Sequence, residues 1–198
     1  MNHLAHLWLG EDDDFHRLGQ ILGDFHKGAS CPEHWPTSLV DGVLCHRAID
    51  AHCFRSDHWQ QLYTLAPEGG RRYMPIVLDV VVDHLLAKHW VQYDDRELRE
   101  FDTFCCRSFQ ATRGFWLPEA TGYLSRLSEG GRLSGYERWS TVERVLAIIA
   151  RRFSRAAPFL THSGDWLPKI MPDIEGVFLS YFKSEAQAMR ELRNNMRQ

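Results

Sequence analysis

The chain has 198 residues, of which 44% are hydrophobic, and its formal net charge is −3. This length suits one domain with a sizeable core, and the hydrophobic content is ordinary for a folded protein and too high for a disordered one. The slight negative charge argues against a general nucleic-acid-binding function.

Helical spacing of apolar residues dominates the chain, whereas the alternation typical of β-strands is nearly absent. Turn-forming residues predict loops at 28–36, 66–70 and 128–135, and mostly loop with a short helical turn at 158–172. The predicted helices cover residues 13–27, 37–54, 56–65, 71–91, 95–111, 117–127, 139–156 and 174–194. Together they predict a single all-α domain over residues 1–198.

The sequence also bears on where the protein resides. No apolar run approaches the roughly 20 residues needed to span a membrane, and the N-terminus lacks the basic and apolar segments of a signal peptide. The five cysteines follow no zinc-ligand spacing and are odd in number, so we interpret them as reduced thiols. We expect a cytoplasmic protein with no membrane or nucleic-acid partner.

The segment 78–86 is apolar except for two aspartates and a histidine. A helix that is apolar all round lies in a core, where a carboxylate is costly unless it is paired, hydrogen-bonded or bound to a cation. Asp79 and Asp83 are four residues apart and share one helix face. They predict either a cation site or structural salt bridges, in which Arg72 is the candidate partner of Asp79 and Arg47 that of Asp83.

Further polar residues lie on other predicted helices. His46 and Asp50 are four residues apart and share a face, Asp24 lies near the end of the first predicted helix, and His6 lies at a possible helical start. Helical bundles build metal sites from side chains on facing helices. Carboxylates with imidazoles suit Mn, Fe, Zn or Mg. The pattern therefore predicts a divalent cation in the core.

These residues, in this order, resemble the acyl carrier protein phosphodiesterase family. The matching segments lie in the first half of the chain, at residues 1–7, 19–25, 46–50 and 72–90. The resemblance implies an all-helical fold related to the HD phosphohydrolases. It also implies removal of the 4'-phosphopantetheine arm from holo-acyl carrier protein, an acidic protein substrate, with Mn²⁺ or Mg²⁺ as the cofactor.

The resemblance also implies site residues at matching positions. The expected ligands of one or two cations come from a set of five, namely Asp24, His46, Asp50, Asp79 and Asp83. Arg47 also matches the family pattern, and we expect either Arg47 or the nearby Lys27, which the resemblance does not itself indicate, to stabilise charge on the phosphate oxygens. His84, ahead of His6, is expected to donate a proton to the leaving serine oxygen.

The chain departs from the family pattern after Asp50. Phe54 stands where the family has an aspartate, and Ser56 stands where it has a histidine. Asp57 and His58 lie nearby, displaced by three and two positions. Because a shift of three residues rotates a side chain by about 300° around a helix, the simpler interpretation is that part of the site is lost or rebuilt.

Three other functions compete with the carrier-protein enzyme. One is a related phosphohydrolase that acts on a nucleotide or another small phosphoester, which needs the same metal site but no protein-docking face. Another is a non-catalytic helical binding protein descended from the enzyme, which the altered residues Phe54 and Ser56 favour. The last is a purely structural helical domain in which arginines neutralise the buried acids.

Overall fold

Helices account for all of the regular secondary structure in the part of the chain that the computed structural model describes, residues 3–195. The all-α prediction is therefore confirmed. The α-helices are α1 (His3–Leu9), α2 (Asp14–Leu22), α3 (Thr37–Arg55), α4 (Asp57–Tyr63), α5 (Met74–Lys88), α6 (Leu98–Ala111), α7 (Pro118–Leu127), α8 (Trp139–Arg152), α9 (Ala157–Thr161) and α10 (Ser163–Asn195). The 3-10 helices are η1 (Arg71–Tyr73), η2 (Trp90–Gln92), η3 (Arg113–Phe115) and η4 (Ser134–Glu137).

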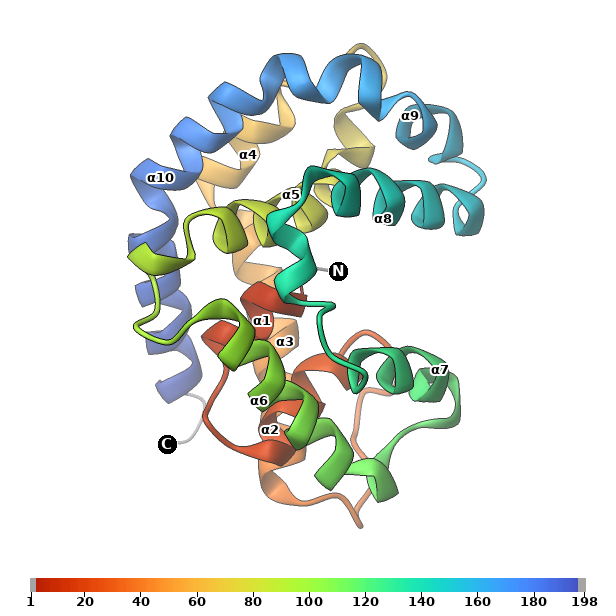
Figure 1. Cartoon of the computed structure of the whole chain (residues 1–198), viewed down its shortest axis with the longest axis vertical. Helices are drawn as coiled ribbons and strands as arrows, with labels where there is room; N and C mark the ends of the chain where they lie inside the picture. The colour runs from red at the N-terminus through yellow and green to blue at the C-terminus, as the bar shows by residue number, and fades with distance from the viewer. Residues whose placement is uncertain (1–2, 196–198) are drawn as a thin grey trace.

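Helix α5 forms the centre of the core. It contacts α1, α4, α8, α10 and η4, and its apolar residues from Val77 to Leu86 are buried. Figure 1 shows α10 running along one side of the molecule and arching over to α9, while α6 and α7 occupy the opposite end. An apolar helix surrounded on all sides gains stability from burial on every face, as the sequence pattern predicts.

Two glycines allow α2 and α3 to pack unusually closely. A Cβ added at Gly19 would lie 2.4 Å from the Leu39 carbonyl oxygen, and one added at Gly42 would lie 2.3 Å from the His16 carbonyl oxygen. Any side chain at either glycine therefore forces the helix backbones apart. This close packing matters because α2 leads into Asp24 and α3 carries His46.

The prediction of a loop at 158–172 is wrong. Helix α10 begins at Ser163 and continues through Pro168 and Pro172. Both prolines are exposed, so water can satisfy the carbonyl groups that lose their helical N–H partners. Leu167 of the same segment is buried, which shows that packing on the core overrides the low helix propensity of proline.

The N-terminal helix α1 is the second difference from the predicted elements, since only a possible start near His6 was expected. Helix α2, in turn, ends at Leu22, so the prediction that it reaches residue 27 is wrong. None of the helices between residues 3 and 195 is both long enough and apolar enough to cross a lipid bilayer.

Candidate metal centre

Helix α1 is held in place by a carboxylate from the core helix α5. Asp83 is fully buried and accepts hydrogen bonds from the backbone N–H groups of Leu4, at 3.1 Å, and Ala5, at 3.0 Å. The first N–H groups of a helix have no partner within that helix, so a carboxylate there acts as a cap. Asp83 thereby fixes the helix that carries His3 and His6.

His46 is fixed where α2 ends against α3. A Cβ at Gly23 would lie 2.4 Å from the His46 ring, so only glycine leaves room for the imidazole. The Nδ1 atom of His46 donates a hydrogen bond to the Gln20 carbonyl oxygen at 2.7 Å. This orients Nε2 toward two carboxylates, with Asp50 Oδ2 at 3.3 Å and Asp24 Oδ1 at 3.7 Å.

His6, His46 and Asp50 form a compact cluster of possible ligands. One donor atom from each lies within 4.8 Å of the other two, and no other such cluster of three or more is found between residues 3 and 195. The His6 and His46 rings stack at 4.0 Å, and His6 Nε2 lies 3.1 Å from Asp50 Oδ1. Two imidazoles and a carboxylate are a suitable donor set for a first-row divalent metal ion.

The protonation states of the residues in and around the cluster also suit the binding of a cation. Burial opposes ionisation of Asp24 and Asp50, yet hydrogen bonds from the histidines hold the pKa of both carboxyl groups well below their usual range. Burial also opposes a charge on His46, but Asp24 and Asp50 raise its pKa to about 9. Burial and the neighbouring His46 lower the pKa of His6 to about 4. Two carboxylates thus surround one protonated imidazole, and a cation can take the place of that proton.

Asp79 lies within electrostatic range of this cluster. It is half-buried on α5, and burial followed by the charges of Asp50 and Asp24 raises the pKa of its carboxyl group. Asp79 therefore adds negative charge near the cluster when ionised, although its oxygen atoms do not belong to the group of converging donors.

The structure does not bring Asp83 and His84 into the cluster. The carboxylate of Asp83 caps α1, and burial raises its pKa to about 7 against the effect of the Ala5 and Leu4 N–H groups. His84 donates from Nδ1 to the Tyr136 carbonyl oxygen at 2.7 Å and packs edge-on against Trp139. His84 therefore lies against η4 and α8, away from the imidazole rings on α1 and α3.

Arg47 and Lys27 lie beside an open pocket at the cluster. The pocket has a volume of about 420 Å³ and is lined by Gly23, Asp24, His26, Lys27, Gly28, Ala29, His46, Arg47 and Asp50. Arg47 donates from Nη2 to the carbonyl oxygens of His26, at 2.7 Å, and Gly28, at 2.9 Å, and not to Asp83. It therefore holds the loop that presents Lys27, whose side chain is exposed.

Two residues at the site were missed by the sequence analysis. His3 is buried, and its Nε2 atom lies 2.9 Å from Asp24 Oδ2. Its Nδ1 atom forms a hydrogen bond with the hydroxyl group of Tyr123 on α7. The spacing of His3 and His6 on one short helix was the available signal, but no local pattern indicates Tyr123.

Comparison with known proteins identifies the family of the chain. A family model described as "Acyl carrier protein phosphodiesterase" matches residues 1–184. The chain belongs to the acyl carrier protein phosphodiesterase family. It is 32% identical over 160 residues to the acyl carrier protein phosphodiesterase of Enterobacter sp. (strain 638), an alignment that covers 78% of this chain and 80% of that protein.

Two further members of the acyl carrier protein phosphodiesterase family align over about half their length. The protein of Serratia proteamaculans (strain 568) is 38% identical over 94 residues, or 48% of each chain. The protein of Salmonella heidelberg (strain SL476) is 37% identical over 92 residues, which cover 46% of this chain and 47% of that protein. No solved structure matches the chain, so the relation to HD phosphohydrolases stays a prediction.

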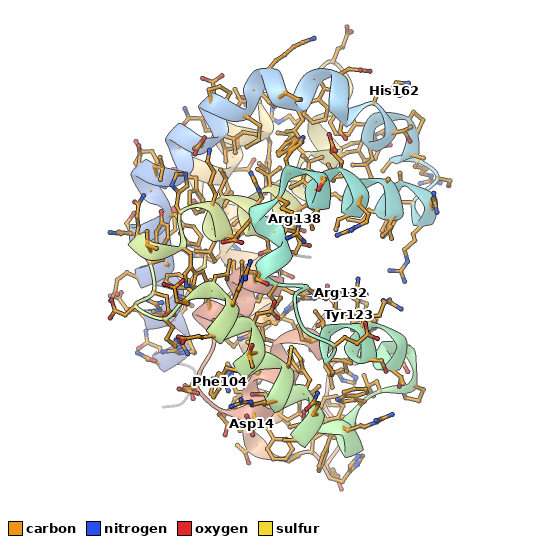
Figure 2. The ribbon with its side chains drawn as sticks, viewed as in Figure 1. Asp14, Phe104, Tyr123, Arg132, Arg138 and His162 are labelled. Atoms are coloured by element: carbon orange, nitrogen blue, oxygen red, sulfur yellow. The ribbon has the colours of Figure 1, made fainter. Side chains whose placement is uncertain are left out.

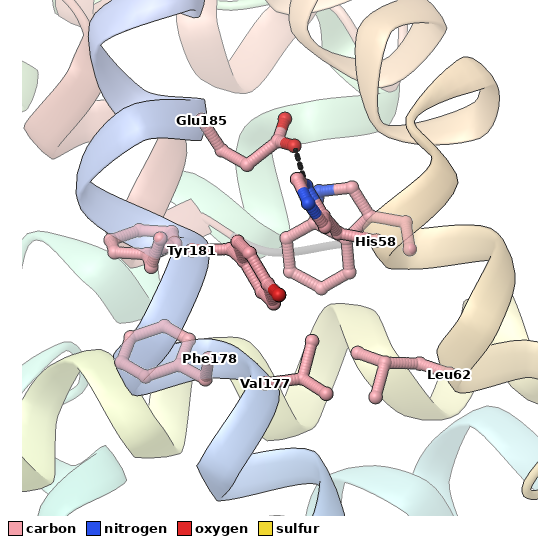
Figure 3. A pocket seen from close by; sticks show the side chains of 8 residues that line it. His58, Leu62, Val177, Phe178, Tyr181 and Glu185 are labelled. Atoms are coloured by element: carbon pink, nitrogen blue, oxygen red, sulfur yellow. Dashed lines mark hydrogen bonds and ion pairs between the residues drawn. The ribbon is translucent and has the colours of Figure 1, made fainter.

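The segment that departs from the acyl carrier protein phosphodiesterase pattern packs against α10. Glu185 of α10 lies 2.6 Å from His58 Nδ1 (Figure 3). It also lies 2.6 Å from His52 Nε2 and accepts a hydrogen bond from Ser56 Oγ at 2.7 Å. Phe54 is 65% exposed. Of the two altered positions, Ser56 therefore contributes to the contact with α10 and Phe54 faces solvent, and neither belongs to the group formed by His6, His46 and Asp50.

Proposed function

We propose that this chain hydrolyses the phosphodiester that joins 4'-phosphopantetheine to the serine of holo-acyl carrier protein, giving apo-acyl carrier protein. The observation that carries the proposal is the convergence of His6, His46 and Asp50 at an open pocket, in a member of the acyl carrier protein phosphodiesterase family. The products are the apo-protein and the free prosthetic arm.

His6, His46 and Asp50 are the residues that we expect to hold a divalent cation, with Asp24 and Asp79 adding negative charge nearby. Two imidazoles favour Mn²⁺ over Mg²⁺, because Mg²⁺ prefers oxygen ligands. When bound, such a cation polarises a phosphoryl oxygen and lowers the pKa of water. His46 suits this role because its Nδ1–H is held by the Gln20 carbonyl group, which fixes the ring and directs Nε2 inward.

The pocket also suits a phosphodiester anion. Lys27 is exposed at its rim and supplies positive charge for the non-bridging oxygens, while Arg47 fixes the backbone of the same loop. In this proposal His6 is a ligand and not the proton donor, because its Nε2 atom faces Asp50. His84 donates to the Tyr136 carbonyl oxygen and lies outside the group of converging donors, so this proposal gives it no direct part in the chemistry.

An acidic carrier protein must approach the side of the molecule on which the pocket opens. Arg126 and Arg132 are exposed and close enough to Tyr123 for their charges to affect the pKa of its hydroxyl group. Figure 2 shows Arg132 and Tyr123 at the same end of the molecule, near α7. We propose that these arginines attract the carrier protein, so the association rate should fall as salt is added.

The test is direct. The protein is incubated with holo-acyl carrier protein and Mn²⁺, and the carrier is then weighed by intact-protein mass spectrometry. A mass loss equal to the prosthetic arm supports the proposal, and chelation with EDTA should prevent it. An unchanged carrier mass, together with cleavage of small phosphoesters, would assign the site to a different substrate. No cleavage and no bound metal would favour a binding protein.

A further inference from the structure

We propose that His3 and Tyr123 act together as positioning residues for Asp24, beside the cation site formed by His6, His46 and Asp50. The inference rests on the proposed cation site and assigns it an outer layer of hydrogen bonds. Carboxylates and imidazoles at metal sites are commonly oriented by such outer partners, which set the affinity of the site.

The geometry links three helical regions in one chain of contacts. Tyr123 of α7 bonds to His3 Nδ1, and His3 Nε2 lies 2.9 Å from Asp24 Oδ2. The other carboxylate oxygen of Asp24, Oδ1, lies 3.7 Å from His46 Nε2. One oxygen of Asp24 is thus committed to His3, and the other faces the candidate ligand His46.

The direction of these hydrogen bonds follows from the chemistry of the groups. The pKa of the Asp24 carboxyl group is held well below its usual range, so Asp24 is ionised and can only accept. His3 must therefore donate from Nε2. Burial lowers the pKa of His3, so its ring is neutral and Nδ1 carries a lone pair. The Tyr123 hydroxyl must then donate to Nδ1, and burial, which raises its pKa, keeps that hydroxyl protonated.

Asp24 keeps the proton on Nε2, and the Tyr123 hydroxyl group holds the ring in place through the lone pair of Nδ1. Without the hydroxyl group, the buried Nδ1 atom lacks its donor, and the imidazole is free to turn about its side-chain bonds. The hydrogen bond from Nε2–H to Asp24 is then no longer held in its present direction. Phe25 packs near the Tyr123 ring, so substitution by phenylalanine removes the hydroxyl group and retains the aromatic contact.

The experiment compares Tyr123→Phe with the wild type and with Tyr93→Phe. Tyr93 packs among Phe178 and Phe182, away from His3, so its variant is the matched control. Nitrogen-15 NMR of the metal-free protein reports the hydrogen bond at His3 Nδ1, and electron paramagnetic resonance reports Mn²⁺ affinity. We expect Tyr123→Phe alone to shift the His3 Nδ1 signal and to lower Mn²⁺ affinity about 10- to 100-fold.

A second pair of variants separates positioning from general packing. His3→Gln keeps an N–H donor near the position of Nε2 without needing a tautomer, whereas His3→Ala removes the donor. We expect His3→Gln to retain most of the Mn²⁺ affinity that His3→Ala loses. In the His3→Gln protein, adding Tyr123→Phe should have little further effect, because no imidazole is left for the hydroxyl group to hold.

The inference is overturned if Tyr123→Phe leaves both the His3 Nδ1 signal and Mn²⁺ affinity unchanged, if it lowers affinity no more than Tyr93→Phe, or if the wild type binds no Mn²⁺. Failure of the proposed function looks different. In that case Tyr123→Phe still weakens Mn²⁺ binding, while the wild-type protein leaves the mass of holo-acyl carrier protein unchanged.

Discussion

Replacing Asp83 tests whether this buried acid is a cap or a metal ligand. Leu4 N–H donates to Oδ2 of Asp83 and Ala5 N–H donates to Oδ1, so Asp83→Ala removes both acceptors, whereas Asp83→Asn retains one acceptor oxygen. Neither substituted side chain titrates, so the comparison of the two variants isolates the hydrogen bonds from the charge.

Alanine leaves both N–H groups without an acceptor, whereas asparagine leaves one of them without an acceptor. A buried donor left without a partner costs about 1–3 kcal/mol. The one additional unpaired donor makes Asp83→Ala less stable than Asp83→Asn by about 1–3 kcal/mol. Because α1 also carries His6, we expect the alanine variant to bind Mn²⁺ more weakly than the asparagine variant.

The wild type differs from Asp83→Asn in its pH dependence. Burial raises the pKa of Asp83 from 3.8 to about 7, so between these pH values the folded state binds more protons than the unfolded state. The contribution of Asp83 to stability therefore falls as the pH rises from about 4 to 7. Asp83→Asn lacks this loss, so its stability relative to the wild type should increase over the same interval.

The assay is urea unfolding followed by circular dichroism at several pH values, with Mn²⁺ titration in parallel. A difference of less than about 0.5 kcal/mol between Asp83→Ala and Asp83→Asn, which is the size of an ordinary surface substitution, would refute the cap. Equal stability with Mn²⁺ binding lost in both variants would instead identify Asp83 as a ligand.

Three further predictions concern the surroundings of the site. His46→Ala should lower Mn²⁺ affinity more than about 100-fold, beyond the usual effect of an outer partner, while the exposed Asp165→Asn should not; equal affinities would exclude His46 as a ligand. Arg47→Ala should release the loop at 26–28, raising KM for holo-acyl carrier protein and the rate of proteolysis there; an unchanged KM and cleavage rate would contradict this. Glu185→Gln should reduce unfolding stability by about 1–3 kcal/mol near neutral pH. Because the histidines and Ser56 lower the Glu185 pKa against burial, this difference should shrink below about pH 4.5; a difference independent of pH would refute the pairing.

Local patterns in the sequence predict the parts of the site that depend on local geometry. His46 and Asp50 share a helix face because they are four residues apart, and their side chains do meet. The apolar segment of α5 is buried as expected. In both cases the decisive spacing lies within one helix, so the sequence contains the necessary information.

Other parts depend on contacts between distant segments. Helix α1 has only seven residues, and its cap comes from Asp83, 79 positions beyond Leu4. The role of His3 depends on Tyr123, 120 positions away. From the sequence alone, Asp83 has the position that a metal ligand would have. A buried carboxylate that caps another helix and one that binds a cation both appear as a single acid within an apolar helix. Only the three-dimensional arrangement separates the two.

Helix α1 is also joined to the far end of the chain. Arg193 of α10 donates from Nη1 to the carbonyl oxygens of Leu9, at 2.8 Å, and Gly10, at 2.9 Å, and the Arg190 guanidinium group lies 4.1 Å from the centre of a Trp8 ring. Neither arginine lines the pocket. A substitution at Arg190 or Arg193 is therefore expected to loosen the helix that carries His6 from a position remote from the candidate ligands.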